Sequence, residues 1–132
     1  MKDDIQKKII QFQILEANLK SLQEREELFN ERVREIETTK AALEELKQIK
    51  PNKTLIPLGS GSFISGKIED SEDIIIGIGS GVAIKKKRND AIAFLDFKSK
   101  ETEKEINNIR NQGSMIALQL AKIQQEVEKE QE

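Results

Sequence analysis

The chain has 132 residues, of which 35% are charged and only 4% are aromatic, and it contains neither Trp nor Tyr. A chain with this composition has too few large apolar side chains for a compact core of ordinary size. We therefore expect it to bury apolar surface in contacts between chains. The formal net charge of -2 combines 22 basic with 24 acidic residues. This balance predicts no binding to nucleic acid or to an anionic membrane.

The sequence also has no Cys and no His. Their absence excludes a disulfide framework, the usual zinc sites and the usual catalytic triads. We therefore expect no catalytic residue, no cofactor and no metal, and a protein that is not an enzyme. The start MKDDIQKKII is too polar for a secretory signal, and no apolar run approaches the ~18 residues of a membrane helix. A cytoplasmic protein is the resulting expectation.

Residues 3–48 contain no Gly or Pro and consist mostly of good helix formers, which predicts one long helix ended by Pro51 and Asn52. Its apolar residues recur every 3.5 residues, the pattern of a coiled coil. The a positions are Ile5, Phe12, Leu19, Glu26, Val33 and Lys40, and the d positions are Lys8, Leu15, Leu22, Phe29, Ile36 and Leu43.

A second long helix is predicted from Asn89 or Asp90, either of which can cap its first turn, to about Lys129. It carries the same repeat. The a positions are Ile92, Ser99, Ile106, Gly113, Leu120 and Val127, and the d positions are Leu95, Thr102, Ile109, Ile116 and Ile123. Because both helices leave one central block, an antiparallel helical hairpin is expected.

The pairing of the two helices can be predicted by matching a with a and d with d along the antiparallel pair. This places Glu26 opposite Gly113 and Lys40 opposite Ser99, and the unusual polar positions of the two helices then coincide. The same rule places Lys8 opposite Glu130.

The central block, residues 51–88, is rich in Gly and Ile and reads as two β-hairpins. Gly-Ser-Gly joints at 59–61 and 79–81 supply the tight turns, and Pro57 predicts an edge strand or a bulge. The expected strands are 54–58, 62–68, 74–78 and 82–87. The fold class is thus α+β, a coiled-coil hairpin joined by two central β-hairpins.

The strand at 74–78 is apolar on both faces, and two short hairpins cannot cover both. Cover by other subunits is expected, so that the hairpins serve as an oligomerisation platform. The candidate oligomerisation residues are Phe63, Ile64, Ile74, Ile75, Ile76, Ile78, Val82 and Ile84.

The start of the first helix carries more apolar residues than the seam can use. They are Ile5, Ile9, Ile10, Phe12, Ile14 and Leu15. Only Phe12 and Leu15 are claimed by the seam, which leaves Ile5, Ile9, Ile10 and Ile14 without cover from the chain. These six are a candidate interaction site at the tip of the helical pair, and the family resemblance given below makes it a candidate client-binding site; the alternatives are a frayed terminus or packing on another subunit.

Two further motifs give weaker signals. Gly77 to Lys85 superficially matches a kinase glycine loop and its lysine strand, but the spacing is wrong and no other kinase element is present. The basic cluster 85–88 could contact phosphates, although acidic neighbours favour salt bridges.

The segments LIPLGSGSFISGKI (55–68) and IIIGIGSGVAIKKKRNDAIAFL (74–95), with Asp90-Ala91 opening the second helix, resemble the α-class subunits of prefoldin, above all the archaeal form. The resemblance implies one prefoldin-like domain over 1–132, with helices at 1–50 and 89–132 and the platform at 51–88. It further implies a hexamer with prefoldin β subunits, two α and four β, whose strands form a double β-barrel.

The resemblance also implies a function. Such assemblies hold unfolded client proteins at the coiled-coil tips without ATP and deliver them to a group II chaperonin. The competing hypothesis is a structural coiled-coil module, a scaffold or filament subunit without clients. The two differ at the free ends of the helices, where a scaffold needs no apolar side chains.

Overall fold

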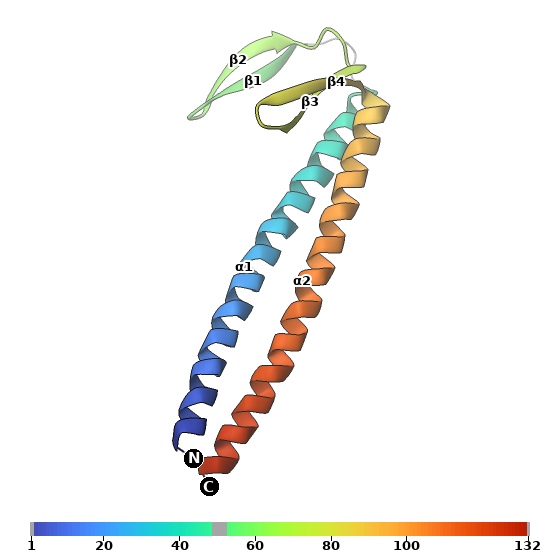
Figure 1. Cartoon of the computed structure of the whole chain (residues 1–132). Coiled ribbons are helices and arrows are strands. Elements are labelled where there is room, and N and C mark those ends of the chain that lie inside the picture. Colours follow the sequence, from blue (N-terminus) through green and yellow to red (C-terminus); the bar gives the residue numbers. More distant parts are fainter. Residues whose placement is uncertain (1, 49–52, 132) are drawn as a thin grey trace. The chain divides into compact units, whose positions relative to one another are not determined.

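The structure is a computed structural model, and it describes residues 2–48 and 53–131. The elements follow one another as α1 (Lys2–Glu45), β1 (Lys53–Gly59), β2 (Ser62–Lys67), β3 (Asp73–Gly79), β4 (Val82–Lys87) and α2 (Arg88–Gln131) (Figure 1). The predicted fold class is confirmed. The predicted helix terminators Pro51 and Asn52 lie outside the described residues.

The chain forms two compact units, one from the described parts of 1–34 and 100–132 and one from 35–99. In each unit a segment of α1 runs antiparallel to a segment of α2 (Figure 1). In the first unit Lys8 contacts Glu130, and in the second Lys40 contacts Asp96. A residue further along α1 is therefore in contact with a residue nearer the start of α2, as expected for antiparallel helices.

Burial along both helices follows the predicted heptads. Every predicted a and d residue is buried or half-buried, and most of the residues between them are exposed. The buried apolar residues of the described chain are few: Leu43, Ala91, Ile106, Ile109 and Ile123. The apolar repeat thus forms one narrow seam rather than a broad core, as expected for a coiled coil.

The predicted pairing of the helices was wrong by about one helical turn. Glu26 accepts a hydrogen bond from Arg110, three residues before the predicted partner Gly113, and a Cβ on Gly113 would lie in contact with Leu19. The Lys40 ammonium donates to Asp96 at 2.9 Å, and Asp96 again lies three residues before the predicted partner, Ser99. The Ser99 hydroxyl instead donates to Glu37 at 2.9 Å. The contact predicted for Lys8 with Glu130 is confirmed at 2.8 Å.

The error has a packing cause. Side chains at matched a positions of an antiparallel pair lie on the same side of the seam, so at equal height they compete for one space. An offset of half a heptad lets each side chain enter the hole between two others. Accordingly Phe12, an a residue, lines a groove with the d residue Ile123 as well as with the a residue Val127. Gly113 likewise lines a groove with Leu22 as well as with Glu26.

The strands form two separate antiparallel sheets of two strands each, β1 with β2 and β3 with β4. In the first turn Ser60 and Gly61 have φ of 50° and 77°, and the second turn repeats this geometry. Positive φ at both central residues is the requirement of the tight turn that fits the twist of a hairpin. The register shifts between Pro57 and Gly59, which confirms the irregularity predicted from Pro57.

Arg88 ties the start of α2 to the link between the hairpins. Its side chain is 8% exposed, donates to the Ser71 carbonyl at 3.2 Å and pairs with Glu72 at 3.0 Å. Because α2 begins at Arg88, Asn89 and Asp90 lie inside its first turn, and the prediction that one of them caps the helix was wrong. Asp90 still places a carboxylate where the helix dipole favours it.

The basic cluster forms salt bridges, as predicted. Lys87 pairs with Asp73 at 2.8 Å and Arg88 with Glu72, while Lys86 lies over the Phe94 ring at 5.3 Å. The Lys87 hydrogen bond lowers the pKa of Asp73.

Gly113 provides a test of the seam. Replacing it with Ala should raise the free energy of unfolding by about 1 kcal/mol, since Gly costs roughly that much in a helix interior. The added methyl would lie in ordinary contact, 3.5 Å from Leu19 Cδ1. Denaturation followed by circular dichroism measures the change, and the exposed neighbour Ser114→Ala is the control, with a smaller effect. A loss of stability in Gly113→Ala would contradict the packing described.

Charge reversal tests the corrected pairing. Lys40→Asp should lower Tm, because Lys40 is 16% exposed and would then place a second carboxylate beside Asp96. The double variant Lys40→Asp with Asp96→Lys should regain most of the loss. No recovery in the double variant would show that the two residues do not meet.

The same ion pair predicts a pH dependence. The hydrogen bond from Lys40 to Asp96 raises the pKa of Lys40, so its contribution to stability is present below the ordinary lysine pKa and is lost as pH rises through the raised value. The Tm difference between the wild type and Lys40→Met should therefore shrink in strongly alkaline buffer and stay constant around neutral pH.

Candidate functional site

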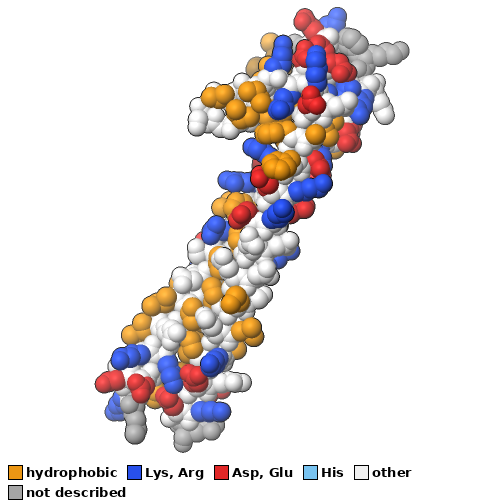
Figure 2. All heavy atoms as spheres, turned by 45° about the vertical axis from the view of Figure 1, so that its right-hand side comes forward, with side chains coloured by type: hydrophobic (Ala, Val, Ile, Leu, Met, Phe, Trp, Pro, Cys, Tyr) orange, Lys and Arg blue, Asp and Glu red, His pale blue; other side chains and the backbone are white. Residues whose placement is uncertain are grey.

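Two surfaces of the described residues expose apolar side chains in groups. The first, called here the terminal patch, consists of Ile9, Ile10 and Ile14 near the start of α1, with exposed fractions of 41%, 56% and 56%. The second, called the hairpin surface, lies on the four strands. Figure 2 shows hydrophobic side chains over the hairpins and again along the helices.

The terminal patch contains three of the six client-binding residues predicted from the sequence. Phe12 and Leu15 are half-buried in the seam, as expected. Ile5 is also half-buried, so the prediction that the chain gives it no cover was wrong. Ile5 occupies an a position and therefore faces α2, whereas Ile9, Ile10 and Ile14 lie at positions e, f and c, outside the seam.

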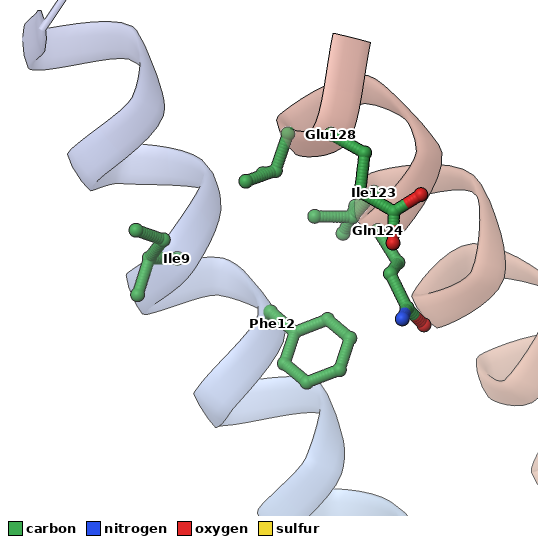
Figure 3. Close-up of a pocket in the computed structure, with 6 residues that line it drawn as sticks. Ile9, Phe12, Ile123, Gln124 and Glu128 are labelled. Carbon is green, nitrogen blue, oxygen red and sulfur yellow. The ribbon is translucent and has the colours of Figure 1, made fainter. Parts of the chain in front are cut away.

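An apolar groove of about 210 Å³ lies beside the terminal patch, between the two helices. Ile9 and Phe12 form its α1 side, and Ile123 and Val127 form much of its α2 side. Figure 3 shows the Phe12 ring pointing from α1 toward the part of α2 that carries Ile123 and Gln124. The groove thus joins the exposed Ile9 to the buried seam and offers an apolar side chain a partly enclosed place.

Charged residues hold the helices together next to this groove. The Lys8 ammonium pairs with Glu130 at 2.8 Å and with Glu126 at 3.6 Å. The hydrogen bond to Glu130 raises the pKa of Lys8, so Lys8 stays charged at neutral pH. This contact fixes the two ends of the helical pair around the groove.

The hairpin surface is larger than the sequence predicted. Among the predicted oligomerisation residues, Phe63, Ile64, Ile75, Ile78 and Val82 are exposed and Ile74, Ile76 and Ile84 are half-buried. The structure adds three exposed residues of β1 that the prediction missed: Leu55, Ile56 and Leu58. The run LIPL was itself a signal, since it too places apolar residues on both faces of a strand.

Ile75 is the most exposed of the predicted oligomerisation residues, at 72%. Its strand neighbours Ile74 and Ile76 point to the opposite face, where they are half-buried. Each sheet has only two strands, so neither can cover its own faces. This surface is of the kind that marks a contact with another chain.

Other features of the described chain give no chemistry. Four further apolar side chains, Leu28, Phe97, Met115 and Leu118, are also exposed on the helices. Within residues 2–48 and 53–131 no three carboxylates converge as metal ligands do. Over the same residues neither helix is apolar enough to span a bilayer.

A helical hairpin interrupted by two exposed β-hairpins defines a class of coiled-coil subunit with a strand platform. The chain belongs to the prefoldin family, because the family model for prefoldin subunits matches residues 15–132. Prefoldin subunit alpha of Pyrococcus horikoshii is 33% identical, over 97% of this chain and 90% of the relative. That of Thermococcus onnurineus is 36% identical, over 75% and 69%.

A solved structure of filamentous PFD from Methanocaldococcus jannaschii has the same fold. Its TM-score is 0.65, with 15% sequence identity, and the match covers 96% of this chain and 99% of that one. The resemblance drawn from the strand motifs is confirmed by these relatives.

Proposed function

We propose that this chain is the α-type subunit of an ATP-independent chaperone that holds unfolded proteins. The observation that carries the proposal is the terminal patch, where three isoleucines are exposed beside an apolar groove. An unfolded protein exposes apolar side chains, and burying each one stabilises a contact by roughly 1.5 to 3 kcal/mol. Several weak contacts of this kind hold a client without requiring a particular sequence.

The surroundings of the patch suit a chaperone that releases its clients. The patch has no array of fixed hydrogen-bond donors, and its isoleucines stand on a surface otherwise made of charged and polar residues. Apolar contact without directional bonds is tolerant of client shape. Delivery of clients to a group II chaperonin and a cytoplasmic location belong to the proposal through the family alone.

The hairpin surface supports the second half of the proposal, assembly with other prefoldin subunits. Eight large apolar side chains of the strands are exposed, and isolated two-stranded hairpins are only marginally stable in water. Incorporation into a barrel would cover these side chains and supply more strands. We propose the family arrangement, in which two copies of this chain join four β subunits through residues 51–88, with the helices of 1–50 and 89–132 as arms.

A scaffold or filament subunit is the alternative function. The filamentous relative in Methanocaldococcus jannaschii shares the fold of this chain, so that fold is compatible with a filament. The terminal patch distinguishes the two functions, since a scaffold gains nothing from isoleucines exposed beside a groove.

Replacement of the terminal patch tests client binding. The variant Ile9→Ser/Ile10→Ser/Ile14→Ser should form the same assembly as the wild type and lose most of its ability to suppress aggregation of a denatured test protein. Light scattering measures the suppression of aggregation, and native mass spectrometry measures the assembly.

The matched control replaces three apolar residues elsewhere on the helices that are more exposed than the patch, at 62%, 66% and 72%, in the variant Leu28→Ser/Met115→Ser/Leu118→Ser. It should retain suppression. Full suppression by the patch variant, or an equal loss in the control, would contradict the proposed site and would favour the scaffold.

A charge within the hairpin surface tests assembly. Ile75→Asp should weaken association with an archaeal prefoldin β subunit by about ten- to a hundredfold, because each 1.4 kcal/mol of lost burial is a factor of ten. The control Ile75→Val keeps an apolar strand residue and should assemble. Sedimentation velocity measures both, and unchanged assembly of Ile75→Asp would show that Ile75 stays exposed in the complex.

A further inference from the structure

The groove beside the terminal patch has a single charged residue in its wall. Six residues line the groove, and five of them are uncharged: Ile9, Phe12, Ile123, Gln124 and Val127. The sixth is Glu128, which is exposed. Figure 3 shows the Glu128 carboxylate on the same side of α2 as the Gln124 amide. An apolar side chain that enters the groove therefore brings its sequence neighbours close to one carboxylate.

The helix that carries Glu128 supplies no cation to pair with it. A charged residue on a helix interacts with residues three and four positions away, whereas the adjacent residue does not face it. For Glu128 the residues three and four positions away are Gln124, Gln125, Gln131 and Glu132. Its adjacent residue Lys129 is thus badly placed to neutralise it.

The facing helix does not neutralise Glu128 either. Lys8, next to Ile9 in the sequence, is the lysine of α1 that reaches this end of α2, and it already pairs with Glu130 at 2.8 Å and Glu126 at 3.6 Å. Neither of those two glutamates lines the groove. Within residues 2–48 and 53–131, Glu128 forms no ion pair. Its negative charge is therefore available to a molecule bound in the groove.

The surroundings of Glu128 favour a basic partner with an apolar neighbour. Apolar walls make an ion pair stronger than it is in open water. Lysine and arginine also have long apolar stems, which can lie along an apolar wall such as Val127 while the charged end reaches a carboxylate. An acidic residue brought to the same place would be repelled.

We propose that Glu128 selects clients by charge: the groove binds an apolar side chain of the client, and the Glu128 carboxylate pairs with a lysine or arginine next to it in the client sequence. This rests on the client-binding part of the proposed function and specifies which segments of an unfolded protein are held best. A glutamate that only kept the helix end hydrated would not distinguish between clients of different charge.

Three fluorescent peptides test the selection. They have the same length and a central leucine, which is flanked by lysine in the first, by glutamate in the second and by alanine in the third. The full-length chain is assembled with an archaeal prefoldin β subunit, and fluorescence anisotropy measures the affinity of each peptide. Each affinity for a charged peptide is expressed relative to that for the alanine peptide. Because the β subunits are the same in every complex, differences between variants come from this chain.

The wild-type complex should bind the lysine peptide about two- to fivefold more tightly than the glutamate peptide, the range expected for one ion pair near a surface. Glu128→Gln should reduce this preference, and Glu128→Lys should reduce it further or reverse it. The preference should also shrink as the salt concentration rises, since salt screens exposed charges. The matched control is Glu103→Lys, which makes the same charge change at an exposed position of α2 outside the groove and should keep the wild-type preference.

Equal binding of the lysine and glutamate peptides by the wild-type complex would overturn the proposal. The same would follow from an unchanged preference in Glu128→Lys, or from an equal change in Glu103→Lys, which would show that only net charge matters. Circular dichroism checks that all variants keep their helices. Client binding itself is tested separately by the terminal-patch variant and the alanine peptide, so loss of the charge preference alone would leave the proposed function standing.

Discussion

A single copy of this chain cannot cover its own apolar residues, and both of its exposed apolar surfaces follow from this shortage. The seam between α1 and α2 is two positions wide in each heptad, so it buries Leu43, Ile106, Ile109 and Ile123 but has no room for Ile10 or Ile14. The hairpins have two strands each, so they leave Leu55, Phe63 and Ile75 in water. In the proposed function, the apolar surface on the hairpins serves assembly and the apolar surface near the start of α1 serves clients.

The polar residues of the seam determine how the two helices pair. Three half-buried charged residues of α1 form ion pairs with α2: Lys8 with Glu130, Glu26 with Arg110, and Lys40 with Asp96. The sign alternates along each helix, so a slipped pairing would bring charges against apolar residues or against like charges. A uniformly apolar seam would have no such preference, which is why polar residues at a positions are known to specify pairing at some cost in stability.

The sequence predicted the elements well because each had a local cause. The heptads, the Gly-Ser-Gly turns and Pro57 act through neighbouring residues, and both helices, both turns and the bulge were found near their predicted positions. The pairing of the helices was missed because it depends on how side chains interlock across the seam, which the residue types alone do not show. The exposure of Ile9, Ile10 and Ile14 was predictable from their positions. That of Leu55 and Leu58 was missed although the run LIPL places apolar residues on both faces of a strand, and the structure adds that β1 has only β2 as a neighbour in its sheet.

The two exposed surfaces differ in the kind of partner their chemistry can accept. The hairpin surface combines isoleucines with the outer edges of two-stranded sheets, and because hydrogen bonds are directional, a strand that added there would be held in one register. The terminal patch offers side chains on a helix whose own backbone groups are already hydrogen-bonded, so contact there depends on apolar area and little on direction. In the proposed function, backbone availability therefore distinguishes specific assembly from tolerant client binding, although isoleucines are exposed on both surfaces.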